Sequence, residues 1–396
     1  MSLSPPGRHL STGHLYVVNS SAGAEHRVPT KSNLNPNTAR NPLLPTTLAL
    51  SLAILLGGAV VSAQPLQDCL PGGSGRFNAD LSLRYDNVYS LTDRADIHRP
   101  RVWLRPGFDL NPTAWLHTGA RGSFALSSDA NSQNISRFDN FHSNDISLDR
   151  VYIAIERNDL EACAGKFAMP FQISEMIWDA DIQPTGFYVA FQHSRFTLRG
   201  GLFHRSHIHH DRSTIAAGQL AFHYNLTSRW AIESDTGYFG FNALDQFQPG
   251  MERQNRALLS EGRLRYLSSF ELANGRYRVD YLGLGHWPLS IESTIVYNFG
   301  APDERRALEV RAQLGKLEER RDWQFTYSFQ RVQRDAVVGA FTSDDWWYHS
   351  DFRGSRFTAA FSPVSPMFLQ FSAIFQKRNS TDNLVKRFQF DVGARF

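Results

Sequence analysis

Five basic residues lie in alternating segments, at positions that extended strands would turn to the same side. Side chains two or four residues apart share one face of a strand, and neighbouring strands lie about 5 Å apart. Basic side chains gathered on such a wall favour anions. Alternatively, they form ion pairs with Asp80, Asp109 and Asp149 and hold the wall rigid. The five basic residues are Arg101, Arg105, Arg121, Arg150 and Lys166.

Trp178, Asp179 and Asp181 form a second cluster, in a segment that interrupts the strand pattern and ends at Pro184. A long connection at this point is predicted to fold inward, so that the two carboxylates face the arginines at a constriction. The alternative is a loop whose hydrogen bonds brace the ends of strands. A Ca²⁺ ion takes roughly six to eight oxygen ligands. Two carboxylates are too few, so no metal is expected here.

A histidine-rich segment is the only group of residues with metal-like spacing. Imidazoles at such spacings bind Zn²⁺ or Cu²⁺, but nothing here fixes a closed geometry, so a solvated loop is expected. The sequence has no Gly-x-Ser-x-Gly motif, phosphate-binding glycine loop or CxxC pair. The chain is therefore predicted to be no enzyme and to hold no metal or cofactor. The segment contains His204, His207, His209, His210 and Asp211.

The segments that must hold these residues alternate between apolar and polar side chains, which is typical of strands. The chain ends in such a segment. Phe388, Phe390, Val392, Ala394 and Phe396 share one face, and Arg387, Gln389, Asp391, Gly393 and Arg395 share the other. Residues 77–85, 102–110, 323–329 and 369–375 show the same pattern. A barrel with lipid outside and water inside requires it, and the terminal phenylalanine is typical of the strand that closes an outer-membrane barrel.

The connections between these segments alternate between tight turns and longer polar excursions, as expected of an outer-membrane barrel. Longer excursions are predicted at Ser127–Asp145, Asn242–Asn255 and Phe341–Asp351. Counting segments predicts an all-β antiparallel barrel of about 16 strands, with the poorly alternating residues 256–266 in an external excursion. If that excursion is a barrel hairpin, the number is 18. The tight turns are predicted at Asn111–Thr113, Arg157–Leu160, His193–Arg195, Leu226–Ser228, His286–Leu289, Glu319–Asp322 and Ser362–Met367.

The start of the chain has the features of an export signal. An apolar run, Leu43–Val61, follows Arg40 and ends in small residues, which predicts cleavage after Ala63. An uncleaved single-span anchor is the alternative. The predicted organisation is a disordered extension plus signal peptide over 1–63, a periplasmic segment over 64–75 and a transmembrane barrel over 76–396.

The charges and cysteines of the exported part follow from this division. Removing residues 1–63 takes away four of the 41 basic residues and one of the 38 acidic ones, which leaves 37 of each. A balanced mature chain gives no reason to expect a nucleic-acid partner, and it favours lumenal ion pairs over a free positive patch. The two cysteines, Cys69 and Cys163, would enter an oxidising compartment, where a disulfide at the periplasmic mouth is predicted. Two free thiols are the alternative.

One segment also carries a family resemblance. Gly165-Lys166-Phe167-Ala168-Met169-Pro170-Phe171, followed by Trp178-Asp179-Ala180-Asp181 and Pro184-Thr185-Gly186, resembles the putative-porin family of Gram-negative outer-membrane proteins, related to phosphate-selective porins. The Asp322-Trp323 strand, residues 335–345 and the C-terminal strand are also similar. The resemblance implies passive transport of solutes.

These observations together predict an outer-membrane porin, a passive diffusion channel for small hydrophilic solutes with a lean toward anions. A barrel-scaffolded enzyme, a surface adhesin and a soluble secreted β protein are the alternatives. The expected partners are outer-membrane lipid, the solutes, and the barrel-assembly machinery, which would engage the strand ending at Phe396. A homotrimer is one candidate assembly.

Overall fold

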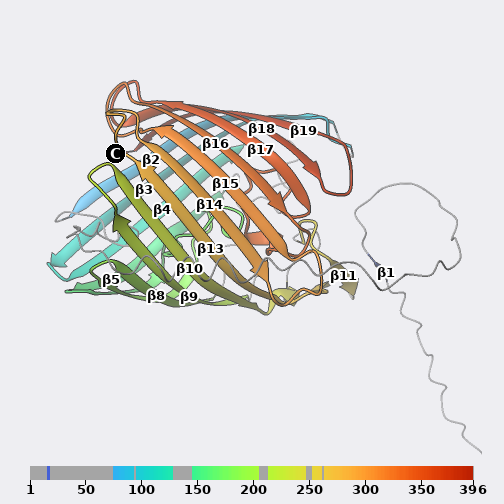
Figure 1. The fold of residues 1–396 in the computed structure, drawn as a ribbon, viewed down its shortest axis with the longest axis horizontal. Coiled ribbons are helices and arrows are strands. Elements are labelled where there is room, and N and C mark those ends of the chain that lie inside the picture. Colours follow the sequence, from blue (N-terminus) through green and yellow to red (C-terminus); the bar gives the residue numbers. More distant parts are fainter. Residues whose placement is uncertain are drawn as a thin grey trace, which may run out of the picture.

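A closed barrel of 16 antiparallel strands forms the body of the protein, as predicted (Figure 1). The computed structural model describes residues 16–17, 75–92, 95–127, 145–204, 213–246, 252–260 and 263–395. The predicted signal peptide and periplasmic segment therefore lie outside the described residues. Within the described residues, no helix has both the length and the apolar composition needed to cross a membrane.

Nine barrel strands precede residue 243 and seven follow residue 269. The first group is β2 (Arg76–Tyr89), β3 (Ile97–Thr113), β4 (Leu116–Ser127), β5 (Asp145–Arg157), β6 (Leu160–Lys166), β7 (Thr185–His193), β8 (Phe196–His204), β9 (Thr214–Asn225) and β10 (Trp230–Asn242). The second group is β13 (Phe270–Tyr281), β14 (Leu289–Asn298), β15 (Arg306–Gly315), β16 (Trp323–Val332), β17 (Phe352–Phe361), β18 (Met367–Arg378) and β19 (Val385–Arg395). Pairing of β19 with β2 closes the barrel, with Arg395 opposite Asp80.

The chain between β10 and β13 leaves the barrel wall. It contains a short 3-10 helix, η1 (Leu244–Gln246), and a hairpin of β11 (Ala257–Ser260) and β12 (Arg263–Tyr266). This hairpin forms a separate small sheet with β1 (Tyr16–Val17). Strands β10 and β13 pair directly with each other along their full length, so the wall has no free edge for the hairpin. The prediction of 16 strands is therefore confirmed, and the alternative of 18 is wrong.

Side chains alternate across the wall as the sequence predicts. On β2 the apolar side chains of Phe77, Leu83 and Tyr85 are exposed on the outer surface. The polar side chains between them point inward, where the guanidinium of Arg84 lies 2.6 Å from the carboxylate of Asp391 on β19. Lipid-facing and lumen-facing residues alternate in this way in transmembrane barrels. The outer surface is thus suited to a bilayer and the inner surface to water.

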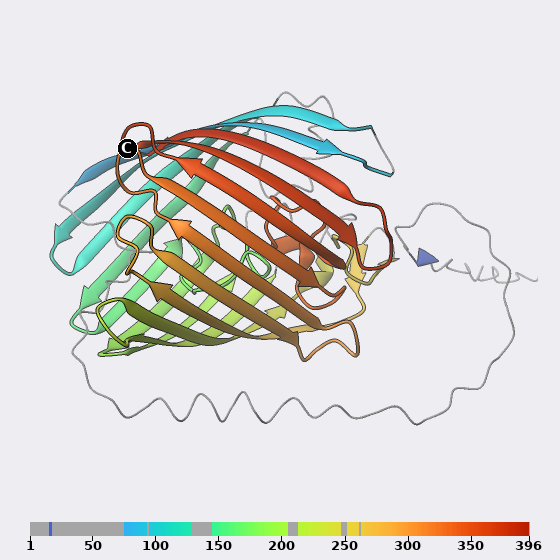
Figure 2. The same cartoon turned by 45° about the horizontal axis from the view of Figure 1, so that its top comes forward.

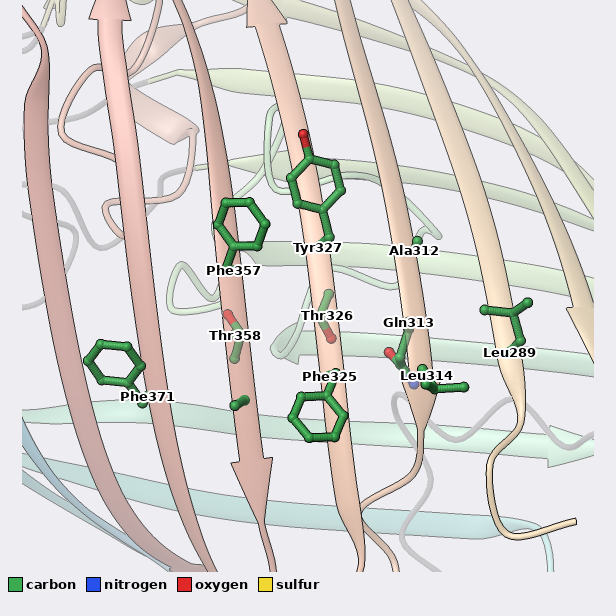
Figure 3. Close-up of a pocket in the computed structure, with 11 residues that line it drawn as sticks. Leu289, Ala312, Gln313, Leu314, Phe325, Thr326, Tyr327, Phe357, Thr358 and Phe371 are labelled. Carbon is green, nitrogen blue, oxygen red and sulfur yellow. The ribbon is translucent and has the colours of Figure 1, made fainter. Parts of the chain in front are cut away.

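The outer surface carries a shallow apolar groove of about 360 Å³ over β14–β18 (Figure 3). Exposed rings of Phe325, Phe357 and Phe371 line it, and the small side chains of Ala312 and Ala359 leave space between them. Since these residues belong to the outward apolar face, the groove is separate from the polar interior.

The short and long connections are sorted to opposite ends of the barrel. One set of turns lies at the end where β2 begins and β19 ends. It comprises the turns β3–β4, β5–β6, β7–β8, β9–β10, β13–β14, β15–β16 and β17–β18. All the predicted tight turns belong to this set. The long connections, including the one between β6 and β7, lie at the opposite end. In porins, the end with the short turns is the periplasmic one.

The last strand leads to a prediction about assembly. Phe390 on β19 is exposed on the outer face. Phe396 lies an even number of residues further along and is expected to continue that face, although it lies outside the described residues. Deleting Phe396, or replacing it by Asp, is expected to reduce insertion of the folded barrel into the membrane strongly, because this strand must present an apolar face to lipid and pair with β2. Heat-modifiable gel mobility of membrane fractions measures folding. Unchanged assembly of both variants would contradict the prediction.

Candidate functional site

A loop leaves the wall after β6 and enters the barrel. We call residues 167–184 the strap. At the point of departure Gly165 has φ +124°, and a Cβ atom there would clash with the carbonyl oxygen of Val151, so glycine is required. Much of the strap is buried. Figure 2 shows it as a green loop in the interior of the barrel. Its most buried apolar residues are Phe167, Phe171, Met176, Ile177, Trp178 and Ile182.

The first half of the strap crosses to the far side of the lumen. Gln172 accepts a hydrogen bond from Arg276 of β13, and its carbonyl accepts one from Gln219 of β9 at 2.8 Å. Two residues later, Ser174 donates to Glu309 on β15. The strap begins at β6, so these contacts place its middle against strands on the opposite part of the wall.

Glu175 ends this crossing in a partly buried, charged setting. Its carboxylate lies 2.7 Å from the guanidinium of Arg356 on β17 and accepts a hydrogen bond of 2.8 Å from the indole N–H of Trp346. Burial would raise the pKa of Glu175, but the positive charges of Arg356 and Arg311 outweigh it and lower the pKa below its usual value. Glu175 is therefore ionised at neutral pH and joins the strap to this part of the wall.

The second half of the strap returns to the strands near its start. The carboxylate of Asp181 lies 2.6 Å from the guanidinium of Arg105 on β3. Gln183 accepts a hydrogen bond of 3.2 Å from Arg150 on β5. The strap thus contacts β9, β13, β15 and β17 on its way out and β5 and β3 on its way back. A loop with this path narrows the open cross-section of the barrel.

A second loop fills space beside the strap. We call residues 333–351, between β16 and β17, the plug. Its ring of Phe341 stacks on Trp178 with centroids 5.0 Å apart, and the amide of Asp179 donates to the Phe341 carbonyl at 2.7 Å. The sequence placed Phe341–Asp351 in an external excursion, and this is wrong, because most of this segment, including Phe341, Trp346 and His349, is buried. The buried apolar plug residues are Ala336, Val337, Val338, Ala340, Phe341, Trp346 and Tyr348.

The plug is also tied to the wall by charge. Asp345 lies 2.6 Å from Arg84 of β2 and 3.7 Å from Arg356 of β17. Burial would raise the pKa of Asp345, but Arg84, Arg356 and Arg387 together hold it well below its usual range. The carbonyl oxygens of Asp344 and Asp345 both accept hydrogen bonds from Arg387 of β19. The plug therefore stays ionically anchored across the neutral pH range.

The arginines predicted to form a positive patch each have a polar partner in the structure. Arg101 lies 3.7 Å from Asp86, and Arg121 lies 3.1 Å from Asp80 and also contacts Asp149. The third expected carboxylate, Asp109, instead accepts from Asn78 and from the hydroxyl of Tyr152. This arrangement resembles the wall-bracing alternative more than a free cationic patch.

Other residues singled out from the sequence lie apart from this lumenal network. Lys166 pairs in register with Val151, whose side chain faces outward, and its ammonium donates to the carbonyl of Leu148 at 2.6 Å. Cys163 is buried on β6, and Cys69 lies outside the described residues, so their disulfide stays a prediction. Of the histidine-rich segment, only His204, the last residue of β8, is described.

Sequence reasoning missed an ionic group in the wall that is centred on Asp86. Asp86 of β2 is fully buried and accepts hydrogen bonds from Arg387 of β19 at 2.8 Å and from Arg99 of β3 at 3.0 Å. All three residues occupy the inward phase of strands that the sequence defines. Their shared phase was the available signal, but only the closure of β19 on β2 brings Arg387 to Asp86.

Comparison with known proteins agrees with this architecture. Residues 74–237 match the model of a protein family described as "Putative porin", which confirms the resemblance predicted from the motifs. No curated protein matches the sequence. The relation to phosphate-selective porins stays a prediction.

Solved structures with a similar fold are bacterial outer-membrane barrels. A high-pH structure of OprB from Pseudomonas putida aligns with a TM-score of 0.59 and 11% identity, over 82% of this chain and 94% of that chain. A BenF-like porin from Pseudomonas fluorescens Pf-5 aligns with a TM-score of 0.49 and 10% identity, over 81% and 98% of the two chains. At 11% identity the OprB comparison bears on the fold alone, and it supports the closed barrel.

Proposed function

We propose that this chain, which matches the putative-porin family over residues 74–237, is an outer-membrane porin that lets small hydrophilic solutes diffuse passively. The observation that carries the proposal is the closed barrel with an apolar outer face and a polar inner face, crossed by an inward loop. A water-filled barrel of this strand number is wide enough for an aqueous channel. Passage needs no energy source, because the solute follows its own gradient.

The charges of the lumen bear on which solutes pass. Most lumenal arginines sit beside carboxylates, so the fixed field is nearly balanced and neutral hydrophilic solutes are suitable substrates. Arg150 departs from this pattern, because its hydrogen-bond partner is the uncharged amide of Gln183. Among the described residues no carboxylate forms an ion pair with Arg150, and this supports a modest lean toward anions.

Single-channel recording in planar bilayers tests the proposal. The full-length mature protein, refolded in detergent and shown to be heat-modifiable on a gel, is expected to give discrete, ohmic conductance steps. Folded protein that inserts into the bilayer without conductance steps would overturn the channel and favour a barrel-scaffolded enzyme or an adhesin. Cross-linking of the same preparation reports whether the barrel assembles as a homotrimer.

A prediction about selectivity follows from the arginines on β3 and β4. Changing Arg101, Arg105 and Arg121 together to Gln is expected to shift the reversal potential in a salt gradient clearly toward cation preference. The carboxylate of Asp181 would lose Arg105, and those of Asp80 and Asp149 would lose Arg121, so negative charge would dominate the local field.

The matched control removes the same number of positive charges from the tight turns, at the end of the barrel where β2 begins and β19 ends. Arg157, Arg320 and Arg321 are exposed in the tight turns, so their joint change to Gln is expected to move the reversal potential much less. Equal shifts in the two triple variants would show that the lumenal arginines have no special role in selectivity.

A further inference from the structure

The plug also binds a segment from another part of the chain. Residues 252–256, from the chain between η1 and β11, lie against it through several hydrogen bonds. The side chain of Asn255 accepts from the amide of Gly339 at 2.7 Å and donates to the carbonyl of Val337 at 2.9 Å. Arg256 lies 2.6 Å from the buried carboxylate of Asp335. The excursion that leaves the barrel wall thus returns to it by binding the plug.

A buried histidine lies at the centre of this contact. The Nε2 atom of His349 contacts the guanidinium of Arg253, and its Nδ1 atom lies 2.9 Å from the hydroxyl of Thr342. The same hydroxyl donates to the carbonyl of Gly339 at 3.1 Å. The backbone amide of His349 donates to the side chain of Gln254 at 3.1 Å.

These contacts determine the protonation state of the ring. A guanidinium only donates, so Nε2 must accept and carries no proton. The Thr342 hydroxyl donates its hydrogen to the carbonyl of Gly339, so toward the ring it acts as an acceptor, and Nδ1 of His349 is the donor. His349 is therefore neutral, and the chain of donors runs from Arg253 through His349 and Thr342 to Gly339. A second ring proton, on Nε2, would remove the acceptor that Arg253 uses and place two cations in contact.

We propose that Arg253, His349 and Thr342 form an acid-released latch between residues 252–256 and the plug. At neutral pH the neutral ring joins the two segments. In acid, protonation of Nε2 breaks the contact with Arg253, and residues 252–256 separate from the plug at the mouth with the long loops. The device responds to acidification of the medium on that side of the barrel.

The surrounding charges act in the same direction. The charged side chains that act on His349 are Arg253, from the docked segment, and Arg387, from β19. No carboxylate of a described residue lies within ion-pair distance of the ring; the nearby Asp351 pairs with Arg334 and Arg378, and Asp86 pairs with Arg387. Burial first, and these two guanidinium groups second, hold the pKa of His349 well below its usual value.

The sign of the pH effect follows from linkage. A ring that is neutral when docked and free to take up a proton when released favours release as the pH falls below about 6.5, the ordinary histidine value. For one proton, the ratio of released to docked molecules rises by up to about tenfold per pH unit below that value. Above it, the docked form is fully favoured.

Hydrogen exchange measured by mass spectrometry tests the latch on the full mature protein in detergent micelles. The reporters are the amides of Gly339 and His349, which donate to Asn255 and Gln254 across the contact. After correction for intrinsic exchange rates, their protection is expected to fall on the order of tenfold between pH 7.5 and pH 5.0. A flat profile in the wild-type protein would overturn the proposal, whatever the variants show.

Two histidine variants assign the effect. His349→Gln offers one acceptor and one donor without a charge, so protection is expected to stay constant with pH. His98→Gln is the matched control, because His98 is exposed at the same mouth and bonds Asn87 on the neighbouring strand; it should lose protection as the wild type does. Loss of protection in acid by His349→Gln would assign the titration to another group and overturn the latch. The readout needs no conductance, so it is independent of the channel proposal.

Discussion

Replacing strap residues 171–181 by a short glycine–serine linker is expected to raise the single-channel conductance several-fold. The strap crosses from β6 to Arg356 on the far wall and returns to Arg105, so it occupies cross-section that ions would otherwise use. The wall itself is held by pairing along every strand, and it does not depend on the strap for closure. The linker variant should therefore still fold as a heat-modifiable barrel.

The matched control shortens a different connection at the same mouth. Residues 128–144 join β4 to β5, lie outside the described residues, and are predicted from the sequence to be an external excursion. Replacing them by the same linker is expected to change the conductance little. A folded strap variant with wild-type conductance would show that the narrowest section of the channel lies elsewhere.

The wall of the barrel could be predicted from the sequence because a strand has a period of two. Once Arg387 and Phe388 are assigned to opposite faces, every other residue of that strand follows, and the polar face must point to water. The same rule placed Arg84, Arg101 and Arg121 in the lumen, where each has at least one carboxylate partner on an adjacent strand. Tight turns added the order of the strands, because each joins neighbours.

The interior of the lumen could not be predicted in this way. Glu175 and Arg356 are far apart in the sequence, and no periodicity relates a loop to the wall that it touches. Asp179 shows the limit. It was expected to face lumenal arginines, but its carboxylate accepts hydrogen bonds from the backbone amides of Asp181 and Asp344. The second of these bonds holds the strap to the plug. Its neighbour Asp181 does reach Arg105.

The plug shows a second reason. Residues 336–341 are apolar without alternation, which is unusual for an exposed loop, yet their length allows either burial in the lumen or an external position. The stacking of Phe341 on Trp178 decides between them, and it depends on the path of the strap. Two loops that bury each other's apolar surface must be placed together, so neither can be placed from local sequence.

The largest effect on stability is expected from Asp86→Ala. Asp86 is fully buried and accepts hydrogen bonds from Arg387 and Arg99, with Arg101 at 3.7 Å. Removing one partner of a buried ionic group leaves uncompensated charge, which typically costs about 3–5 kcal/mol. The free energy of unfolding, measured by guanidinium titration of tryptophan fluorescence in micelles, is expected to fall by about that amount.

Two further variants separate charge from shape in this cluster. Asp86→Asn keeps the size of the side chain and one acceptor oxygen, so it should lose less stability than Asp86→Ala if hydrogen bonding contributes as well as charge. Asp382→Ala is the control for removing a carboxylate, since Asp382 pairs with Lys377 while its own side chain is 97% exposed. The free energy of unfolding of this variant should stay at the wild-type value.

Because Asp86 joins β2 to both β3 and β19, it supports the closure of the barrel at its only junction between the first and last strands. Equal stability of Asp86→Ala and Asp382→Ala would mean that backbone pairing alone holds that junction, with water replacing the carboxylate around Arg387.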